Sequence, residues 1–314
     1  MNGVAGKVAF ITGGSSGLGL GIAQAFAAAG MKVVIGYRTE ANLHHARAHL
    51  AEELHAIAVD VTDREAMEQA AAETVRRFGK VHVLVSNAGV NVHVPLSKAT
   101  YDDWDWLLNV NLTGVFNGLR AFLPHIAAHG EGGHLIATSS ILGLVASGAL
   151  GVYTTTKFGV VGMMEALRAE LADTNIGVSV ICPGFVTSNL WDTQRNRPSD
   201  LAHSGAEVSP PTGEQLAEAL QAAEAVCMTP LELGRLVLRG MLDNDLYILT
   251  HPEFERSLRE RCEALMASNP WNVDAPEQRV LAEQAFLGNP IYAAERARRT
   301  RSQRAASASD ESDP

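Results

Sequence analysis

The sequence predicts an α/β protein: a Rossmann-type doubly wound parallel sheet of about seven strands, with helices on both faces and a C-terminal helical extension. In the first 190 residues, short runs rich in β-branched residues alternate with longer amphipathic segments, which is typical of repeated βαβ units. The short runs are mostly apolar, as expected for parallel strands covered on both faces. A glycine-rich turn, residues 12–19, joins the first run to the first amphipathic segment, and many doubly wound sheets begin in this way.

Seven strands are predicted in chain order. Each is a short run dominated by valine, isoleucine and other apolar residues, and each is separated from the next by a longer segment or a turn. The predicted strands are Lys7–Thr12, Lys32–Tyr37, His55–Val59, Val81–Ser86, Gly133–Ser139, Gly177–Pro183 and Tyr247–Thr250.

Helices are predicted where apolar residues recur with the spacing of one helix face. Asp63 is a predicted N-cap, and Gly30 and Gly79 stand where helices are expected to end. Thr229 and Glu232 predict a capping box, with a proline at the first helical position between them. The predicted helices are Leu18–Ala29, Ala41–Ala51, Arg64–Phe78, Tyr101–His129, Tyr153–Asp173, Pro230–Asn244 and Glu253–Ala267.

We expect one domain, residues 1–268, followed by a C-terminal extension, residues 269–314. Within the domain, residues 188–228 begin with polar, charged sequence interrupted by proline and glycine. This segment is too long for an ordinary connection of about four to six residues, so we predict a substrate lid. The extension is expected to wrap over the surface and to end in disorder, because its last residues, 307–314, are rich in serine and acidic residues.

Composition limits the kinds of partner. The formal net charge is −10 over 314 residues, which argues against a nucleic acid or an anionic membrane as the main partner. The three cysteines form no C-x-x-C pair, so neither a disulfide framework nor a metal site is predicted. There is no signal-peptide pattern at the N-terminus and no run of about 18 apolar residues. We therefore expect a cytoplasmic enzyme that acts on a small molecule.

The glycine-rich turn predicts a dinucleotide site. Gly13, Gly17 and Gly19 lie between a predicted strand and a predicted helix. Glycines let the backbone approach a pyrophosphate closely, and the free N–H groups of a helix N-terminus favour its negative charge. The spacing differs from the commoner G-x-G-x-x-G, and a plain tight turn is the alternative.

The end of the second strand predicts the choice of dinucleotide. An NAD-selective fold places an acidic residue about 20 residues after the glycine turn to bind the ribose 2′-hydroxyl. Here the strand ends in Gly36-Tyr37-Arg38, without an acid. An arginine can bind a 2′-phosphate through charge-assisted hydrogen bonds, so NADP(H) is preferred and NAD(H) remains possible. The alternative is that Arg38 only faces water.

The pair Tyr153 and Lys157 predicts proton transfer by a tyrosine. Positions i and i+4 share a helix face, so the lysine ammonium can approach the tyrosine phenol and lower its pKa from about 10. A tyrosine tuned in this way can act as a general acid or base. Ser140 stands 13 residues before Tyr153. The isolated Tyr–Lys pair is weak evidence, because it also occurs on ordinary solvated helix faces.

Taken together, these motifs closely resemble the short, single-domain subfamily of the short-chain dehydrogenases/reductases. The resemblance covers about residues 5–190, with the motifs in family order and spacing. The motifs are Thr12-Gly13-x-x-x-Gly17-x-Gly19, Asp60-Val61, Asn87-Ala88-Gly89, Asn109-Val-Asn111, Ser139-Ser140, Tyr153-x-x-x-Lys157, and Pro183-Gly184 with Thr187.

The resemblance implies an NAD(P)H-dependent oxidoreductase that interconverts a ketone and a secondary alcohol. It implies a catalytic tetrad of Asn111, Ser140, Tyr153 and Lys157, in which Tyr153 is the general acid/base. Ser139 is rejected, because only Ser140 has the family spacing to Tyr153. The implied cofactor-binding residues are Gly13, Ser15, Ser16, Gly17, Leu18, Gly19, Tyr37, Arg38, Asp60, Val61, Asn87, Ala88, Gly89, Tyr153, Lys157, Pro183, Gly184, Val186 and Thr187.

The region after the shared motifs resembles a smaller group within the family. Residues 189–198 and 241–251 look like the C-terminal region of bacterial Cα-dehydrogenases, which oxidise benzylic alcohols. Those relatives typically carry the NAD-selecting acid that Tyr37 replaces here. We predict a bulky aromatic ketone or secondary alcohol, contacted by His93, Leu142, Leu190 and Trp191, with the lid arginines Arg195 and Arg197 able to close over it.

Other readings stay open. Within the reductases, a 3-oxoacyl thioester reductase and an NAD-dependent benzylic alcohol dehydrogenase are the alternatives. A non-catalytic NADP(H)-binding regulator is disfavoured because all four tetrad positions are filled. An epimerase or dehydratase of the extended branch is disfavoured because its G-x-x-G-x-x-G turn is missing. The resemblance further implies a homodimer or homotetramer that associates through the two long helices around residues 104–123 and 153–171.

Overall fold

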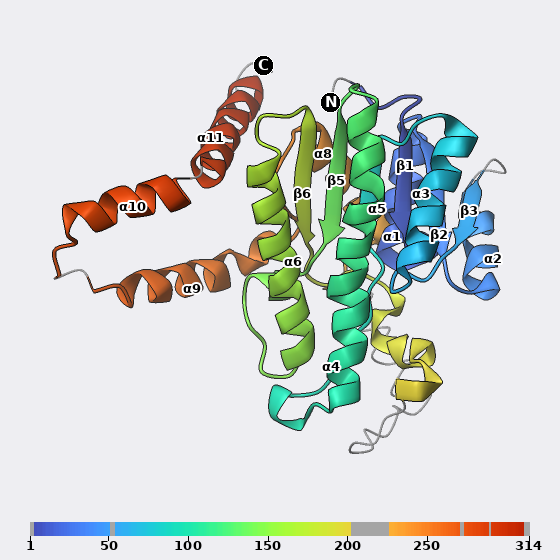
Figure 1. The fold of residues 1–314 in the computed structure, drawn as a ribbon, viewed down its shortest axis with the longest axis horizontal. Helices are drawn as coiled ribbons and strands as arrows, with labels where there is room; N and C mark the ends of the chain where they lie inside the picture. The colour runs from blue at the N-terminus through green and yellow to red at the C-terminus, as the bar shows by residue number, and fades with distance from the viewer. Residues whose placement is uncertain (1–2, 51–53, 202–225, 271–272, 289, 311–314) are drawn as a thin grey trace.

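A seven-stranded parallel sheet forms the centre of the protein (Figure 1). The computed structural model describes residues 3–50, 54–201, 226–270, 273–288 and 290–310. The strand order is β3-β2-β1-β4-β5-β6-β7, which confirms the predicted doubly wound sheet. The strands are β1 (Val8–Thr12), β2 (Lys32–Tyr37), β3 (His55–Ala58), β4 (Val83–Ser86), β5 (Gly133–Thr138), β6 (Ile176–Cys182) and β7 (Tyr247–Leu249).

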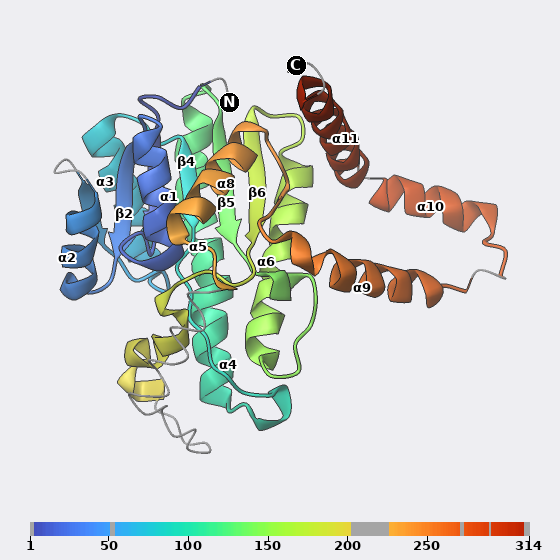
Figure 2. The same cartoon turned by 180° about the vertical axis from the view of Figure 1, so that it is seen from behind.

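Helices cover both faces of the sheet, as predicted (Figures 1 and 2). One apolar core lies between the sheet and α1, α2 and α8, and the other lies between the sheet and α3, α4, α5 and α6. The helices are α1 (Gly17–Ala28), α2 (Glu40–His49), α3 (Arg64–Phe78), α4 (Tyr101–Leu108), α5 (Gly114–Ala128), α6 (Gly151–Glu170), α8 (Pro230–Leu242), α9 (Glu255–Ala267), α10 (Glu277–Leu287) and α11 (Ile291–Asp310).

The predicted continuous α-helix over Tyr101–His129 is wrong at its centre. Residues Asn109–Thr113 form a π-helical turn, η2, between α4 and α5. A π turn within an α-helix is rare and is frequently found at functional sites. Asn111 lies at the middle of this turn and hydrogen-bonds to the backbone of Val90 in both directions. Apolar periodicity could not reveal these contacts of Asn111, because Val90 lies 21 residues away in the sequence.

Helices α1 and α8 pack with their backbones almost in contact. A Cβ atom added to Gly21 of α1 would lie 2.0 Å from the carbonyl oxygen of Pro230, the first residue of α8. No side chain fits in this space, so glycine is required for the two helices to approach. The capping box of Thr229 and Glu232 starts α8 at this point, as predicted.

The C-terminal extension is helical, but it does not wrap over the domain as expected. Helices α9 and α10 project away from the sheet, and α11 returns toward β6 and α6 (Figures 1 and 2). Neither α9 nor α10 has a buried residue. Glu295 and Arg298 anchor α11 to the loop before β7 by hydrogen bonds to Leu246 and Asp245.

Two predictions, the disordered C-terminus and the substrate lid, fall partly outside the described residues. Disorder was expected from about residue 307, whereas α11 continues to Asp310; residues 311–314 lie outside the described residues. The predicted lid is described from Ser188 to Leu201 and from Val226 onward, and its residues 202–225 lie outside the described residues. The first part consists of two short 3₁₀ helices, η4 (Asn189–Asn196) and η5 (Ser199–Leu201). Within the described ranges, no helix is long and apolar enough to span a membrane.

Candidate active site

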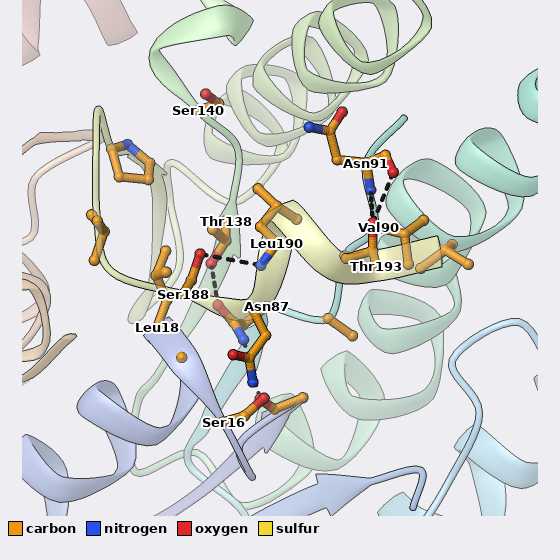
Figure 3. A pocket seen from close by; sticks show the side chains of 18 of the residues that line it. Ser16, Leu18, Asn87, Val90, Asn91, Thr138, Ser140, Ser188, Leu190 and Thr193 are labelled. Atoms are coloured by element: carbon orange, nitrogen blue, oxygen red, sulfur yellow. Dashed lines mark hydrogen bonds between the residues drawn. The ribbon is translucent and has the colours of Figure 1, made fainter. Parts of the chain in front are cut away.

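A cavity of about 410 Å³ opens at the carboxyl ends of the central strands (Figure 3). It lies where the strand order reverses between β1 and β4, the position at which ligands bind to open α/β sheets. The structure brings most of the predicted site residues to its wall. These are Gly13, Ser15, Ser16, Gly17, Leu18, Tyr37, Arg38, Asp60, Val61, Asn87, Ala88, Gly89, Ser140, Leu142, Tyr153, Lys157, Pro183, Gly184, Val186 and Leu190.

The glycine turn has the geometry that a dinucleotide pyrophosphate requires. Gly13 and Gly17 have φ angles of 62° and 50°, in the left-handed region that favours glycine. Ser16 is the N-cap of α1, and its side chain makes no capping hydrogen bond. The first N–H groups of α1 therefore meet the cavity without a side-chain cap, and these residues fit the phosphate groups of a dinucleotide.

Gly19 supports the turn from behind the cavity wall. A Cβ atom at this position would lie 2.3 Å from the carbonyl oxygen of Gly13 and 2.5 Å from Nδ2 of Asn87. Thr12 adds a second link that was not predicted as a site contact. Its hydroxyl accepts hydrogen bonds from the backbone N–H groups of Asn87 (2.8 Å) and Ala88 (3.1 Å). The glycine turn and the segment after β4 are thus held together as one surface.

Ser140, Tyr153 and Lys157 gather at the other end of the cavity. Tyr153 and Lys157 lie one turn apart on α6, and Nζ of Lys157 is 5.3 Å from the centre of the Tyr153 ring. The Ser140 hydroxyl lies next to Tyr153 and accepts a hydrogen bond from the N–H of Leu142 (3.1 Å). Lys157 donates to the carbonyl oxygen of Thr138 (3.0 Å). Three groups that can bind or move a proton therefore share one wall.

Burial sets the protonation of this group. It raises the pKa of Tyr153 to about 12, and the hydrogen bond from Ser140 opposes this rise. Burial also lowers the pKa of Lys157 to about 8. The sequence predicted that Lys157 lowers the pKa of the phenol, whereas in the structure desolvation has the larger effect and raises it. At neutral pH Tyr153 thus carries its proton and can donate it.

Ser139 and Ser140 have different environments. The Ser139 hydroxyl is buried and donates to the carbonyl oxygen of Lys157 (2.8 Å), so it supports the helix that carries the lysine. Both serines line the cavity, but only the Ser140 hydroxyl lies next to the tyrosine. The choice of Ser140 as the catalytic serine stays a prediction, and the two serines differ in the groups that their hydroxyls contact.

Asn111 lies behind the cavity wall rather than in it. Its Oδ1 accepts from the N–H of Val90 (2.8 Å), and its Nδ2 donates to the carbonyl oxygen of Val90 (2.9 Å) and to Thr156 (3.2 Å). A Cβ atom at Gly89 would lie 3.4 Å from Asn111 Oδ1 and 3.7 Å from Lys157 Nζ. Gly89 therefore occupies the space between these two side chains, and the asparagine fixes the segment that follows β4.

Arg38 lies at the end of the cavity away from the tyrosine. It lines the wall with Tyr37 and Asn42, and its guanidinium donates to the carbonyl oxygen of Asn196 in η4 (2.8 Å). The Tyr37 hydroxyl donates to Glu40 (2.9 Å). The alternative that Arg38 only faces water therefore does not describe this structure. It links β2 to the first part of the lid.

The first part of the lid crosses the cavity and is held on its far side. Thr193 donates to the carbonyl oxygen of Asn91 (2.7 Å) and accepts from the Asn91 N–H (3.0 Å), and Figure 3 draws both bonds. Asn91 and Thr193 both line the cavity. Sequence reasoning missed them, since the pairing joins positions 102 residues apart.

The two lid arginines lie in different places. Arg195 lines the cavity. Arg197 does not, and it forms an ion pair with Asp103 of α4 (2.7 Å), with side-chain exposures of 6% and 0%. Its guanidinium also lies 5.1 Å from the centre of the Trp106 ring. The expectation that Arg197 closes over the substrate is wrong, because its charge is neutralised by Asp103 on the flank of the domain.

Three further residues were predicted to contact the cofactor or the substrate. Two of them do not line the cavity, and the side chain of the third lies outside the described part of the structure. His93 is absent from the lining and contacts Asn91 through Nε2 (3.2 Å). Thr187 is also absent, and its backbone N–H donates to the carbonyl oxygen of Met228 (3.0 Å). The backbone of Trp191 belongs to η4, but its side chain lies outside the described part of the structure.

Comparison with known proteins gives a consistent group of relatives. The family model for short chain dehydrogenases matches residues 7–199. A C alpha-dehydrogenase of Sphingobium sp. is 38% identical over 288 residues, which are 89% of this chain and 93% of that protein. A 3-oxoacyl acyl-carrier-protein reductase of Thermotoga maritima is 31% identical over 202 residues, which are 63% of this chain and 82% of that protein.

The fold is shared with solved structures as well. A short chain dehydrogenase/reductase from Burkholderia phymatum, crystallised in complex with NAD, superposes with a TM-score of 0.76 and 33% sequence identity. The alignment covers 88% of this chain and 100% of that chain. The likeness therefore extends beyond the residues that the family model matches.

Proposed function

The chain belongs to the short-chain dehydrogenases, and from this premise we propose that it is an NADP(H)-preferring oxidoreductase that interconverts a bulky aromatic ketone and its secondary alcohol. One observation carries the proposal: Ser140 and Tyr153 lie next to each other in a cavity wall, with the Lys157 ammonium 5.3 Å from the centre of the tyrosine ring. At the opposite end, the glycine turn and Arg38 line the same cavity.

The side chains have separate roles in this proposal. When bound, the nicotinamide supplies the hydride for reduction or accepts it in oxidation. Ser140 orients the substrate oxygen by a hydrogen bond and stabilises the negative charge that develops on it. Tyr153 donates a proton to that oxygen during reduction and removes one from the alcohol during oxidation. The positive charge of Lys157 favours the phenolate form that donation leaves behind.

The assignment of NADP(H) rests on Arg38. Asp60 is the only carboxylate among the residues that line the described cavity, and Arg38 occupies the end where the adenosine ribose is expected. Its bond to Asn196 engages one of five guanidinium donors, so others remain for a 2′-phosphate.

Replacing Arg38 with alanine is expected to lower kcat/KM for NADPH by about tenfold or more, because a charged hydrogen bond contributes about 1.5–3 kcal/mol. The value for NADH should change much less. Initial rates with both cofactors measure this, and Arg47→Ala, an exposed arginine on the neighbouring helix α2, is the matched control. Equal losses with both cofactors, or an intrinsic preference for NADH, would contradict the assignment.

Two observations support an aromatic substrate: the apolar residues of the cavity wall and the extent of the similarity to the relatives. Leu142, Leu150, Leu190 and Phe185 line the cavity around the Ser140 and Tyr153 end, and apolar walls with few polar groups favour bulky apolar ligands. The similarity to the C alpha-dehydrogenase covers 89% of this chain, whereas that to the 3-oxoacyl reductase covers 63%.

A substrate panel tests the proposed function directly. We expect kcat/KM to be at least about tenfold higher for bulky aryl ketones than for small aliphatic ketones, since additional buried apolar surface contributes about 25 cal/mol per Å². Cofactor absorbance follows the rates with aryl ketones, aliphatic ketones and a 3-oxoacyl thioester. Equal rates with aryl and aliphatic ketones, or turnover of the thioester alone, would overturn the substrate class.

An NAD-dependent benzylic alcohol dehydrogenase is the second candidate. The similarity to the C alpha-dehydrogenase of Sphingobium sp. and the NAD in the structure from Burkholderia phymatum favour it. It uses the same Ser140, Tyr153 and Lys157 chemistry in the oxidative direction. The comparison of cofactors described for Arg38 separates the two candidates, because it reports the preference for NADP(H) or NAD(H) directly.

We also propose that the protein is a homodimer or homotetramer that associates through α4–α5 and α6. Large apolar side chains are exposed on the first two of these helices, among them Tyr101 (89%) and Phe116 (54%), and clustered exposed apolar groups mark association surfaces. Light scattering of the purified protein gives its mass. A monomer at micromolar concentration would contradict this proposal.

A further inference from the structure

Asn91 is a polar residue that the proposed chemistry does not use. It lines the cavity two residues after the Asn87-Ala88-Gly89 segment, and only 6% of its surface is exposed. Figure 3 draws its side chain extending from the Thr193 pair toward the end of the cavity where Ser140 lies. A buried amide at this end is close to the position at which the substrate is expected.

The backbone of Asn91 is held in place from both sides. Thr193 of η4, itself 4% exposed, donates to the Asn91 carbonyl oxygen and accepts from the Asn91 N–H. This reciprocal pair fixes the Asn91 Cα position relative to the part of the lid that crosses the cavity. The remaining freedom of the residue lies in its side chain, and rotation of a terminal amide is soft.

The side-chain amide is only half satisfied. Nδ2 contacts Nε2 of His93 at 3.2 Å, and burial lowers the pKa of His93 from 6.5, which favours a neutral ring that can accept this bond. Oδ1 is enclosed and has no hydrogen-bond partner among the residues that the structure describes. A buried acceptor without a partner costs about 1–3 kcal/mol, and such groups in native proteins call for a functional or hydration partner.

We propose that the Asn91 amide determines substrate specificity by accepting a hydrogen bond from a hydroxyl group of the substrate other than the reacting oxygen. This inference rests on the proposed function and narrows its substrate class. An acceptor selects a donor, and the neighbouring walls formed by Leu142 and Leu190 are apolar. The favoured substrate is therefore an aryl ketone or alcohol with a second, free hydroxyl group.

Matched analogues test the proposal with the unmodified enzyme. The probes are aryl propanones with a free hydroxyl, a methoxy group or hydrogen at the terminal chain carbon, and the corresponding set substituted on the ring. In one of the two sets, kcat/KM for the hydroxyl compound should exceed that for the hydrogen compound by about tenfold or more, the value expected from one buried hydrogen bond. The methoxy compound, which cannot donate, should show no such advantage.

Variants show whether Asn91 is responsible. In Asn91→Leu, the ratio of kcat/KM for the hydroxyl and hydrogen compounds should fall to near one, whatever happens to the absolute rates. Asn91→Asp retains an acceptor and should keep a ratio above one. Asn42→Leu replaces another asparagine of the cavity wall and should keep the wild-type ratio. Using a ratio separates recognition from a general loss of folding or activity.

Several outcomes would overturn the inference. A wild-type ratio near one in both sets would show that no hydroxyl is recognised, and an unchanged ratio in Asn91→Leu would place recognition elsewhere. Equal rates with hydroxyl and methoxy compounds would show that the amide N–H, not Oδ1, meets the substrate. Failure of the proposed function is distinguishable, because then none of the three compounds would be reduced in a Tyr153-dependent reaction.

Discussion

Replacing Tyr153 with phenylalanine is expected to lower kcat for ketone reduction by about 10²- to 10⁴-fold, the range associated with loss of a positioned general acid. The substitution removes one hydroxyl and keeps the ring, which is 6% exposed and packs in the core of the α6 side of the sheet. The packing of α6 should therefore survive. The developing negative charge on the substrate oxygen then receives no proton from Tyr153.

Two measurements separate the loss of chemistry from a loss of structure. Steady-state rates report kcat, and titration of cofactor fluorescence reports binding of NADPH, which should change little because the glycine turn and Arg38 are untouched. Tyr101→Phe is the matched control: the same atom is removed from a side chain that is 89% exposed, so rates should match the wild type. A Tyr153→Phe enzyme within about tenfold of the wild-type kcat would rule out this residue as the general acid.

Replacing Arg197 with leucine is expected to lower the free energy of unfolding by about 3 kcal/mol, at the lower end of the cost of breaking a buried ion pair. Asp103 is fully buried, and it also accepts from the N–H of Thr100 at the start of α4 (3.0 Å). Burial raises the pKa of Asp103, but the bonds from Thr100 and Arg197 outweigh this and hold the pKa below its usual value. The variant removes the guanidinium that pairs with this buried carboxylate.

Urea denaturation measures this loss, and Arg256→Leu is the control. Arg256 pairs with Glu260 on α9 at 2.8 Å, but the two side chains are 87% and 60% exposed, and such helix-surface pairs contribute about 0.5 kcal/mol or less. The Arg197 variant should also show a higher KM for ketone, since the bond tethers the segment that crosses the cavity. Equal stability of the two variants would show that the Asp103 pair does not stabilise the fold.

The sequence alone was sufficient to predict the features that depend on neighbouring residues in the chain. The order of strands and helices follows from apolar periodicity and from turn residues, and the doubly wound sheet follows from their alternation. The capping box at Thr229 and the N-cap at Asp63 were found in the same way. The glycine turn and the Tyr153–Lys157 pair were also visible, because each lies within one turn or one helix.

Other features depend on residues that are distant in the sequence. The Asn111 side chain in the π turn hydrogen-bonds to Val90, and the Arg197–Asp103 pair joins positions 94 residues apart. Asn91 and Thr193 carry no motif at all. Even the pKa of Tyr153 followed the depth of its burial rather than the neighbouring charge that the spacing suggested.

Local propensity and motif spacing thus determined the family, the sheet and the residues that line the two ends of the cavity. Only the tertiary structure decided how the lid segment is held, where the two lid arginines lie, and that α9 and α10 leave the domain surface. The physical reason is that these features arise from pairings across the fold. The free energy of such a pairing depends on burial and geometry, which neighbouring residues in the chain do not encode.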